Sequence, residues 1–249
     1  MAEPFVFHAS QLLGERAFPL YASFMACMVL PGDVAECGVF QGHTALELAL
    51  YLKWRGLDKK LHMFDTFTGF PDVATDEEKA MFDPSLPWTD LSPGAFMCTV
   101  NGVGKFMEGS GSNRYTLYPG AFSDTLPRFH RPLCWIHADG DLYQSTVDVI
   151  KLADRVLVPG GCMVIDDYGH PRFPGVKRAA AECLSLDLYY FFESLDLRQA
   201  FAVKRGDDSD VAALVLDRIK RAARGLMAEV FAEMVMEVGK DLEMTVEVF

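Results

Sequence analysis

Short apolar runs that end near glycine or aspartate recur along this chain, and stretches with helical spacing separate them. A strand buried on both faces reads as such a run, so the alternation predicts βαβ units and an α/β fold with a mostly parallel sheet. Two later runs, 189–194 and 200–203, predict a hairpin at one edge of the same sheet. The other five predicted strands are 34–39, 61–64, 115–118, 133–137 and 162–165.

The stretches between these runs predict amphipathic helices. Residues 43–54 carry Leu46, Leu50 and Trp54 at spacings of four, which is typical of a helix packed on a sheet. A second helix is expected to start near Ser145 and to end before the glycines that follow Pro159, and a third to begin near Gly175 or Val176.

Length and composition indicate one domain and a small-molecule partner. Half of the 249 residues are apolar and 23% are charged, so residues 1–249 can form a single domain around one substantial core. A net charge of −12 argues against nucleic acid or an anionic membrane as a partner, because both attract clustered Lys and Arg. The longest early apolar stretch, 24–30, is too short to span a bilayer, and we expect a cytoplasmic protein.

Two segments exceed the minimal pattern. Residues 72–114 are too long for an ordinary connection and predict a lid over the active site, although an insertion that only packs on the domain fits as well. The tail, 207–249, predicts a helical extension whose apolar stripe packs on its own domain or on a second subunit, and a homo-oligomer is expected. That stripe consists of Val211, Val215, Ile219, Ala222, Leu226, Val230 and Met234.

The segment 34–42 predicts a strand that runs through a glycine turn into a helix. Gly38 and Gly42 let the backbone approach a ligand closely, and the helix start offers free N–H groups. The G-x-G-x-x-G pattern of dinucleotide sites is absent, and Glu36 would repel a pyrophosphate but would suit a cationic or hydrogen-bond-donating ligand. The alternative is a tight turn that binds nothing.

Asp65 stands at the expected end of the second strand, 23 residues after Gly42. A carboxylate there accepts hydrogen bonds from both hydroxyls of a ribose, so it indicates an adenosine-containing cofactor without saying which one. The alternative is a residue that only shapes the turn.

Two acidic clusters follow the fourth and fifth predicted strands, Asp139-Gly-Asp141 and Asp166-Asp167. All strands of a parallel sheet end at the same edge, so these carboxylates are expected to converge beside the glycine turn. They would repel one another without a cation, and oxygen ligands without His or Cys suit Mg²⁺, Mn²⁺ or Ca²⁺. Asp166 and Asp167 can share one ion only if the strand has already ended there.

A metal at this place would lower the cost of removing a proton from an acceptor hydroxyl that acts as a nucleophile. A nearby carboxylate or histidine then takes the proton. We assign Asp139 to the metal and Asp141 to the base, with His170 as the rival base.

These residues resemble the macrocin O-methyltransferase family of bacterial antibiotic-sugar methyltransferases. The resemblance rests on five blocks between residues 34 and 168, which come in the family's order. They are Ala35-Glu-Cys-Gly-Val-Phe40 with Gly42, Phe64-Asp-Thr-Phe67 with Gly69-Phe-Pro71, Gly120-Ala-Phe-Ser-Asp-Thr-Leu-Pro127, Asp139-Gly-Asp-Leu-Tyr143 with Ser145-Thr146, and Pro159-Gly-Gly161 leading to Asp166-Asp-Tyr168.

The resemblance implies a Rossmann-like class I methyltransferase fold: a seven-stranded, mostly parallel sheet with helices on both faces, here with a cap insertion and a helical tail. It also implies S-adenosylmethionine as methyl donor, Mg²⁺ as metal, and a deoxysugar hydroxyl on a natural product as acceptor. By likeness, the metal ligands are Asp139, Asp166 and Asp167, and the base is Asp139 or Asp141. The donor-binding set is Glu36, Gly38, Gly42, Thr44, Asp65 and Thr66, with Gly120 and Phe122 near the adenine.

Two rival functions share part of this pattern. A nicotinamide-dependent oxidoreductase uses the same strand, turn and ribose carboxylate, but it has no use for converging aspartates. A non-catalytic partner subunit would keep the fold and dimerise through the C-terminal stripe.

Overall fold

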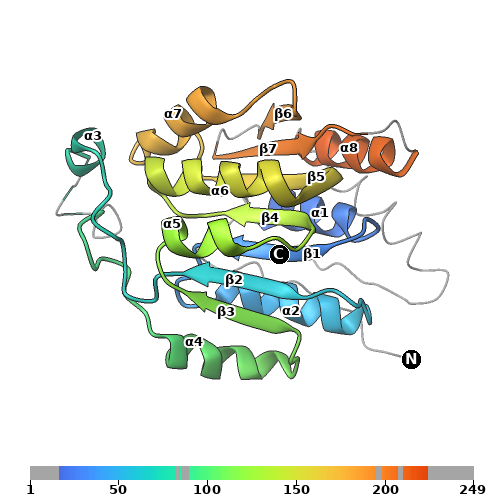
Figure 1. The fold of residues 1–249 in the computed structure, drawn as a ribbon, viewed down its shortest axis with the longest axis horizontal. Helices are drawn as coiled ribbons and strands as arrows, with labels where there is room; N and C mark the ends of the chain where they lie inside the picture. Colours follow the sequence, from blue (N-terminus) through green and yellow to red (C-terminus); the bar gives the residue numbers. More distant parts are fainter. Residues whose placement is uncertain are drawn as a thin grey trace.

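A twisted seven-stranded sheet forms the centre of the protein, in the order β3-β2-β1-β4-β5-β7-β6 (Figure 1). The computed structural model describes residues 17–223 except 82, 84, 86–89, 195–197 and 207–209. Strands β1 to β5 pair in parallel, and β7 runs antiparallel to β5 and β6, so the expected mostly parallel α/β sheet is confirmed. The strands are β1 (Asp33–Cys37), β2 (Leu61–Asp65), β3 (Tyr115–Pro119), β4 (Leu133–Ala138), β5 (Leu157–Asp166), β6 (Tyr189–Glu193) and β7 (Gln199–Lys204).

Helices cover both faces of this sheet, as expected, and each face has its own apolar core (Figure 1). One core receives side chains from α1 (Ala17–Cys27), α2 (His43–Trp54), α4 (Val100–Met107) and α8 (Asp210–Ala223). The other receives them from α5 (Phe122–Thr125), α6 (Tyr143–Val156) and α7 (Pro174–Cys183).

Helix α1 was not foreseen from the sequence. Its residues are apolar on every side, so no periodic stripe marks it as a helix. Phe24 is fully buried and packs edge to face on Trp135, with ring centres 5.2 Å apart, while the Trp135 indole donates to the Ser23 hydroxyl at 3.0 Å. The helix therefore belongs to the sheet-covering layer.

The predicted bounds of α2 are confirmed, but its predicted buried face is wrong. Leu46, Leu50 and Trp54 are only half-buried, whereas Leu48 and Leu52 are fully enclosed. Ala45, Ala49 and Tyr51 are buried with these two leucines, so the most deeply buried side of α2 is rotated away from the predicted stripe.

The boundaries of β1 and β5 differ from prediction for local reasons. β1 ends at Cys37, because Gly38 takes a positive φ of 97°. Residues 159–161 were expected to lie in the loop that follows α6, yet they belong to β5. They form a bulge there. Leu133 of β4 pairs with Leu157 and Trp135 pairs with Cys162, so two steps along β4 correspond to five along β5.

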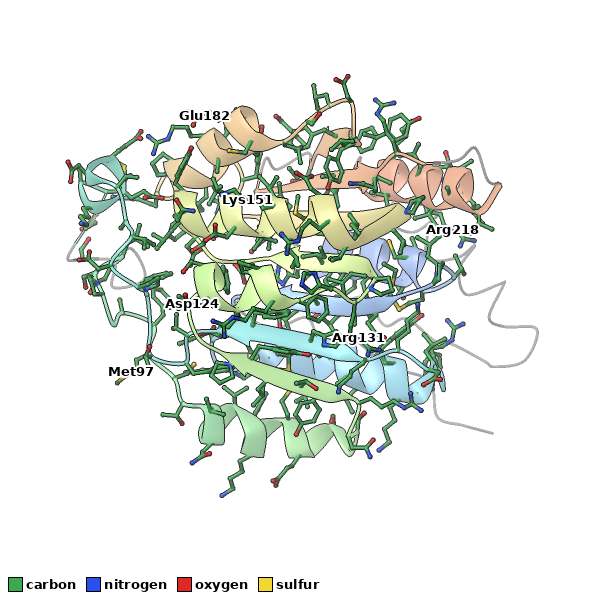
Figure 2. The ribbon with its side chains drawn as sticks, viewed as in Figure 1. Met97, Asp124, Arg131, Lys151, Glu182 and Arg218 are labelled. Carbon is green, nitrogen blue, oxygen red and sulfur yellow. The ribbon has the colours of Figure 1, made fainter. Side chains whose placement is uncertain are left out.

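The segment predicted as one lid, 72–114, has two parts. α4 packs against α2 and β3 and buries Val103 and Met107 in the core, so it is an ordinary sheet-covering helix. The part before it contains α3 (Asp76–Lys79) and lies beyond the carboxyl ends of the strands (Figure 1). Met97 in this part extends into solvent and is 70% exposed (Figure 2).

The first half of the predicted C-terminal stripe packs on the chain's own domain. Val215 and Ile219 of α8 are fully buried, in a layer with α1, although Val211 remains largely exposed. Residues 224–249, which carry the rest of the stripe, lie outside the described residues. None of the helices in the described part of the chain combines the length and apolar character that crossing a bilayer requires.

A buried polar network joins the amino ends of β1 and β2 to β3. The Asp33 carboxylate accepts from Arg131 at 3.0 Å and lies 3.1 Å from His62 Nε2, and His62 Nδ1 lies 3.0 Å from the Tyr118 hydroxyl. Arg131 lies over this part of the sheet (Figure 2). Burial lowers the pKa of His62, although the hydrogen bond to Asp33 opposes that shift.

Phe24→Ala tests the packing of α1. Removing a fully buried aromatic ring is expected to reduce the free energy of unfolding by about 3–5 kcal/mol. Val29→Ala, at a position that is 56% exposed, should change the same quantity by less than about 0.5 kcal/mol. Urea unfolding followed by circular dichroism measures both, and equal effects would contradict the buried position of Phe24.

His62→Gln tests the polar network through its pH dependence. Because the folded pKa of His62 lies below the unfolded value of about 6.5, the unfolded chain binds the proton first as the pH falls. Folding stability is therefore lost below about pH 6.5 until the folded pKa is reached. His62→Gln should lose less stability between pH 7 and 5 than the wild type, while the exposed-site control His130→Gln should follow the wild type.

Candidate functional site

A cavity of about 490 Å³ opens at the carboxyl edge of the sheet, where β1, β2, β4 and β5 end. Most residues predicted for the site line it, namely Glu36, Gly38, Thr44, Asp65, Thr66, Phe122, Asp139, Asp141, Asp166, Asp167 and His170. Gly42 and Gly120 are not among the lining residues. The topology explains the convergence, since each of these strands points its carboxyl end at the same edge.

Gly38 is required by the neighbouring strand as much as by any ligand. A Cβ at this position would overlap the carbonyl oxygen of Asp139, and the positive φ of 97° also favours glycine. The Asp139 N–H donates to the Cys37 carbonyl at 2.8 Å. The turn after β1 and the acidic loop after β4 are thus in direct backbone contact.

Gly42 and Gly120 lie outside the cavity lining and hold the backbone of neighbouring segments. Gly42 precedes α2 with φ 87°, and a Cβ there would lie 3.3 Å from Val103 of α4. The Gly120 N–H donates to the Asp65 carbonyl at 2.9 Å and holds the end of β3 beside β2.

Asp65 organises the backbone of the glycine turn. Its Oδ2 accepts from the N–H groups of Val39 and Phe40 at 2.8 and 3.0 Å, and its Oδ1 accepts from the Phe67 N–H at 2.7 Å. Phe40 and Phe67 both have positive φ, of 46° and 56°. The turn-shaping role that the sequence left open is therefore present, and the carboxylate also lines the cavity.

Glu36, which lines the cavity, forms a buried pair with His137. Glu36 Oε1 lies 3.1 Å from His137 Nδ1, and both side chains are almost completely enclosed. Within the described residues, Glu36 Oε2 and His137 Nε2 have no hydrogen-bond partner. Burial alone lowers the pKa of His137, but the hydrogen bond to Glu36 and the charges of Asp139 and Asp166 raise it to about 9.

The aspartates converge as predicted, but in two overlapping groups. Ligand atoms of Asp139, Asp141 and Asp167 lie within 4.8 Å of one another, and so do those of His137, Asp139 and Asp166. Asp139 is common to both groups. The predicted set of Asp139, Asp166 and Asp167 is therefore divided between them, with Asp141 and His137 as additional neighbours.

Backbone geometry explains how adjacent aspartates reach one site. β5 ends at Asp166, and Asp167 turns out of the strand with a positive φ of 51°. Asp141 likewise has φ 59°, in a tight turn closed by the Leu142 N–H and the Gly140 carbonyl at 2.6 Å. Such conformations cost about 1–3 kcal/mol each and persist only where the surroundings hold them.

Like charges and burial change the proton affinity of this cluster. Burial, followed by the charge of Asp166, raises the pKa of Asp139 to about 8. Burial and the neighbouring aspartates raise the pKa of Asp141 well above its ordinary value, and Asp141 also hydrogen-bonds Asp167. A divalent cation would reverse this effect, because it favours the ionised carboxylates.

His170 lines the cavity, but its geometry suits a donor better than a base. The backbone N–H of Arg172 donates to His170 Nδ1 at 3.1 Å, so this nitrogen is unprotonated and Nε2 carries the hydrogen of a neutral ring. A neutral His170 in this tautomer offers no lone pair at Nε2 to accept a proton.

Several residues in or next to the cavity lining were not foreseen. His137 precedes the acidic cluster and shares its alternation parity with Asp139, so that parity was an available signal. Arg198 reaches the cavity from the β6–β7 connection, where no motif marks it. Phe40 and Phe96 meet edge to face at 5.5 Å, because the segment near Gly94 folds back onto Phe70.

Solved methyltransferase structures share this fold. The structure of the O-methyltransferase NovP aligns with a TM-score of 0.62 at 22% identity, over 78% of this chain and 80% of that one. CalS11, a calicheamicin methyltransferase, aligns with a TM-score of 0.64 at 22% identity, over 79% of this chain and 80% of that one. These likenesses establish a Rossmann-like class I methyltransferase fold.

Two curated relatives are similar in sequence. One, from Streptomyces olivaceus, is an 8-demethyl-8-(2,3-dimethoxy-alpha-L-rhamnosyl)-tetracenomycin-C 4'-O-methyltransferase, 32% identical over 143 residues, or 56% of this chain and 54% of the relative. The other is the mycinamicin III 3''-O-methyltransferase of Micromonospora griseorubida, 32% identical over 149 residues, or 57% of each chain. The matches thus span about half the length of these relatives.

The family model described as Macrocin-O-methyltransferase (TylF) matches residues 22–183, which include all the strands from β1 to β5 and every residue assigned to the site except Arg198. This chain belongs to the macrocin O-methyltransferase family.

Proposed function

We propose that this protein transfers a methyl group from S-adenosylmethionine to a hydroxyl of a sugar-like acceptor and that it requires Mg²⁺. The observation that carries the proposal is the cavity in which a buried glutamate with a spare oxygen meets four converging aspartates. The glutamate suits a cationic donor molecule, and the aspartates suit a divalent cation and a hydroxyl.

The lining residues fit the methyl donor. A buried carboxylate oxygen without a hydrogen-bond donor is costly, and an ammonium group on the ligand would satisfy Glu36 Oε2. Asp65, Thr44 and Thr66 add polar atoms along the same wall. The cavity volume of about 490 Å³ lies within the range of small-molecule sites. When bound, S-adenosylmethionine supplies an electrophilic methyl group on a positively charged sulfur.

The acidic residues fit a hard divalent cation. Asp139, Asp166 and Asp167 are the proposed metal ligands. Asp141 lies close to Asp139 and Asp167, so it can contact one of these metal-binding carboxylates or the acceptor. Burial, followed by the charge of Asp166, raises the pKa of Asp139, so the cluster benefits from a positive charge among its oxygens. When bound, Mg²⁺ lowers the cost of removing a proton from the acceptor hydroxyl.

Asp141 is the proposed proton acceptor. The reaction forms a carbon–oxygen bond, breaks the carbon–sulfur bond of the donor and releases the hydroxyl proton, so one side chain must receive it. Asp141 lines the cavity beside Asp139, and a divalent cation among the neighbouring aspartates would keep its carboxylate ionised and able to accept a proton. His170 is oriented as a hydrogen-bond donor and serves the acceptor in that capacity.

The acceptor is proposed to be a deoxysugar unit of a specialised metabolite such as an antibiotic. The names of the two bacterial relatives support this choice, and so does the likeness to CalS11, a TDP-rhamnose 3'-O-methyltransferase. The aromatic rings of Phe40, Phe70 and Phe96 offer an apolar wall against which a sugar ring packs. We propose residues 72–99 as the lid over the cavity. We also propose that the protein is cytoplasmic, forms a homo-oligomer and binds neither nucleic acid nor membranes.

Glu36→Gln tests the donor site. S-adenosylhomocysteine should bind the wild type, and the variant should bind it about 10–100-fold more weakly, because one charge-assisted hydrogen bond is lost. Glu47→Gln is the control, since Glu47 lies on α2 outside the cavity lining. Calorimetric titration measures the affinities. If the protein bound NADH and not S-adenosylhomocysteine, the result would favour a nicotinamide-dependent oxidoreductase. If it bound neither compound, the result would favour a non-catalytic subunit.

Asp141→Asn tests the base assignment. With a panel of deoxysugar acceptors and Mg²⁺, methyl transfer should fall about 10²–10⁴-fold while affinity for S-adenosylhomocysteine is retained. His170→Gln should lose far less, and Asp148→Asn, at a half-buried position of α6 outside the cavity lining, should match the wild type. Liquid chromatography with mass detection of the methylated product measures the rates. A larger loss in His170→Gln than in Asp141→Asn would reverse the assignment.

A further inference from the structure

Glu78 is a completely buried carboxylate that the catalytic site does not use. It belongs to α3, in the insertion, and is absent from the cavity lining. Its Oε2 accepts from the Thr75 N–H at 2.7 Å, and its own N–H donates to the Thr75 hydroxyl at 3.2 Å. This capping box stabilises the start of α3 and occupies only one of the two carboxylate oxygens.

The second oxygen of Glu78 caps a helix that lies 65 residues away in the sequence. Oε1 accepts from the Tyr143 N–H at 2.6 Å, and Tyr143 is the first residue of α6. The residue before it, Leu142, provides no side-chain cap of its own. A carboxylate at the start of this 14-residue helix lies where the helix dipole favours a negative charge.

The start of α7 packs on the same carboxylate. Gly175, the second residue of α7, has no room for a side chain, because a Cβ there would overlap Glu78 Oε1 and lie 2.9 Å from the Tyr143 nitrogen. Glu78 thus contacts the first turns of α6 and α7 at one point, in addition to the start of its own helix.

These two helices are the next helices along the chain after the two acidic loops. Tyr143 follows Asp141 by two residues, and α7 begins at Pro174, seven residues after Asp167. Both aspartates have positive φ values, which only the surrounding contacts maintain. The pairing of β4 with β5 sets the spacing of the two loops as far as Ala138 and Ile165. Beyond the strands, the helix starts that meet at Glu78 are contacts that contribute to the separation of the Asp139–Asp141 and Asp166–Asp167 turns.

We propose that Glu78 is a positioning residue that holds the acidic loops 139–141 and 166–167 at metal-binding separation. The insertion is then a structural part of the acidic centre as well as a cover for the cavity. This role rests on the proposed function, because it assigns the loops to a divalent cation. It makes the affinity for that cation depend on a residue that touches neither the metal nor the substrate.

The same helix offers a matched control. Glu77 precedes Glu78, is half-exposed and pairs with Arg178 of α7. Glu77→Gln removes one acidic charge from α3 and one contact between α3 and α7, but it leaves the cap on Tyr143 intact. A second control is Thr75→Val, which weakens the start of α3 and keeps the Glu78 carboxylate.

The experiment compares Glu78→Gln with these controls in the full chain. Mn²⁺ affinity, measured by electron paramagnetic resonance without substrate, should fall about 10–100-fold in Glu78→Gln and stay near the wild-type value in Glu77→Gln and Thr75→Val. Hydrogen exchange in chelator should speed up in residues 139–143 and 166–170 of Glu78→Gln alone. Unchanged exchange in both loops, or equal effects in all three variants, would overturn the proposal.

Two outcomes separate this proposal from the proposed function. If the wild type binds no Mn²⁺, the metal centre is contradicted, while the exchange of the two loops in chelator still decides the role of Glu78. If Glu78→Gln does not fold, hydrogen exchange of the Tyr143 amide in the wild-type protein is the deciding measurement. Protection of that amide without metal supports the cap, and exchange at the rate of an exposed amide overturns it.

Discussion

Mutual repulsion among carboxylates at one sheet edge is the constraint on which this structure depends. Four aspartates and Glu36 surround a single cavity, and burial together with neighbouring charge raises the pKa of Asp139 and Asp141. Such a cluster survives folding only if the backbone holds it rigidly and if a cation or protons reduce its charge. The tight turns at Asp141 and Asp167 and the buried partner His137 provide that restraint.

Backbone contacts connect the glycine turn after β1, on the side of the proposed methyl donor, to the acidic loop after β4. Gly38 has no side chain because the Asp139 carbonyl occupies the space, so the turn after β1 cannot move without the loop after β4. Asp65 holds the other side of that turn through two backbone N–H groups. A donor molecule and a metal bound here would therefore meet at a separation that backbone packing sets.

Much of the fold followed from local patterns, and the errors have identifiable causes. All seven strands and α2 were predicted, because apolar runs and amphipathic spacing are local properties. α1 was missed because it is apolar on every side, and the bulge at 159–161 because Pro and Gly usually end an element. In α2 the spacing of Leu46, Leu50 and Trp54 misled the choice of buried face, since Leu48, Tyr51 and Leu52 are the residues that the structure encloses.

The sequence by itself determined which chemical groups reach the carboxyl edge, because parallel strands carry whatever follows them to the same side. Asp65, Asp139, Asp166 and Asp167 were identified on that ground. Only the tertiary structure decided how they are grouped, that His170 presents a donor, and that Glu78 joins the starts of α6 and α7. These features depend on contacts between residues distant in sequence, and no local pattern records which distant backbone N–H a buried carboxylate will meet.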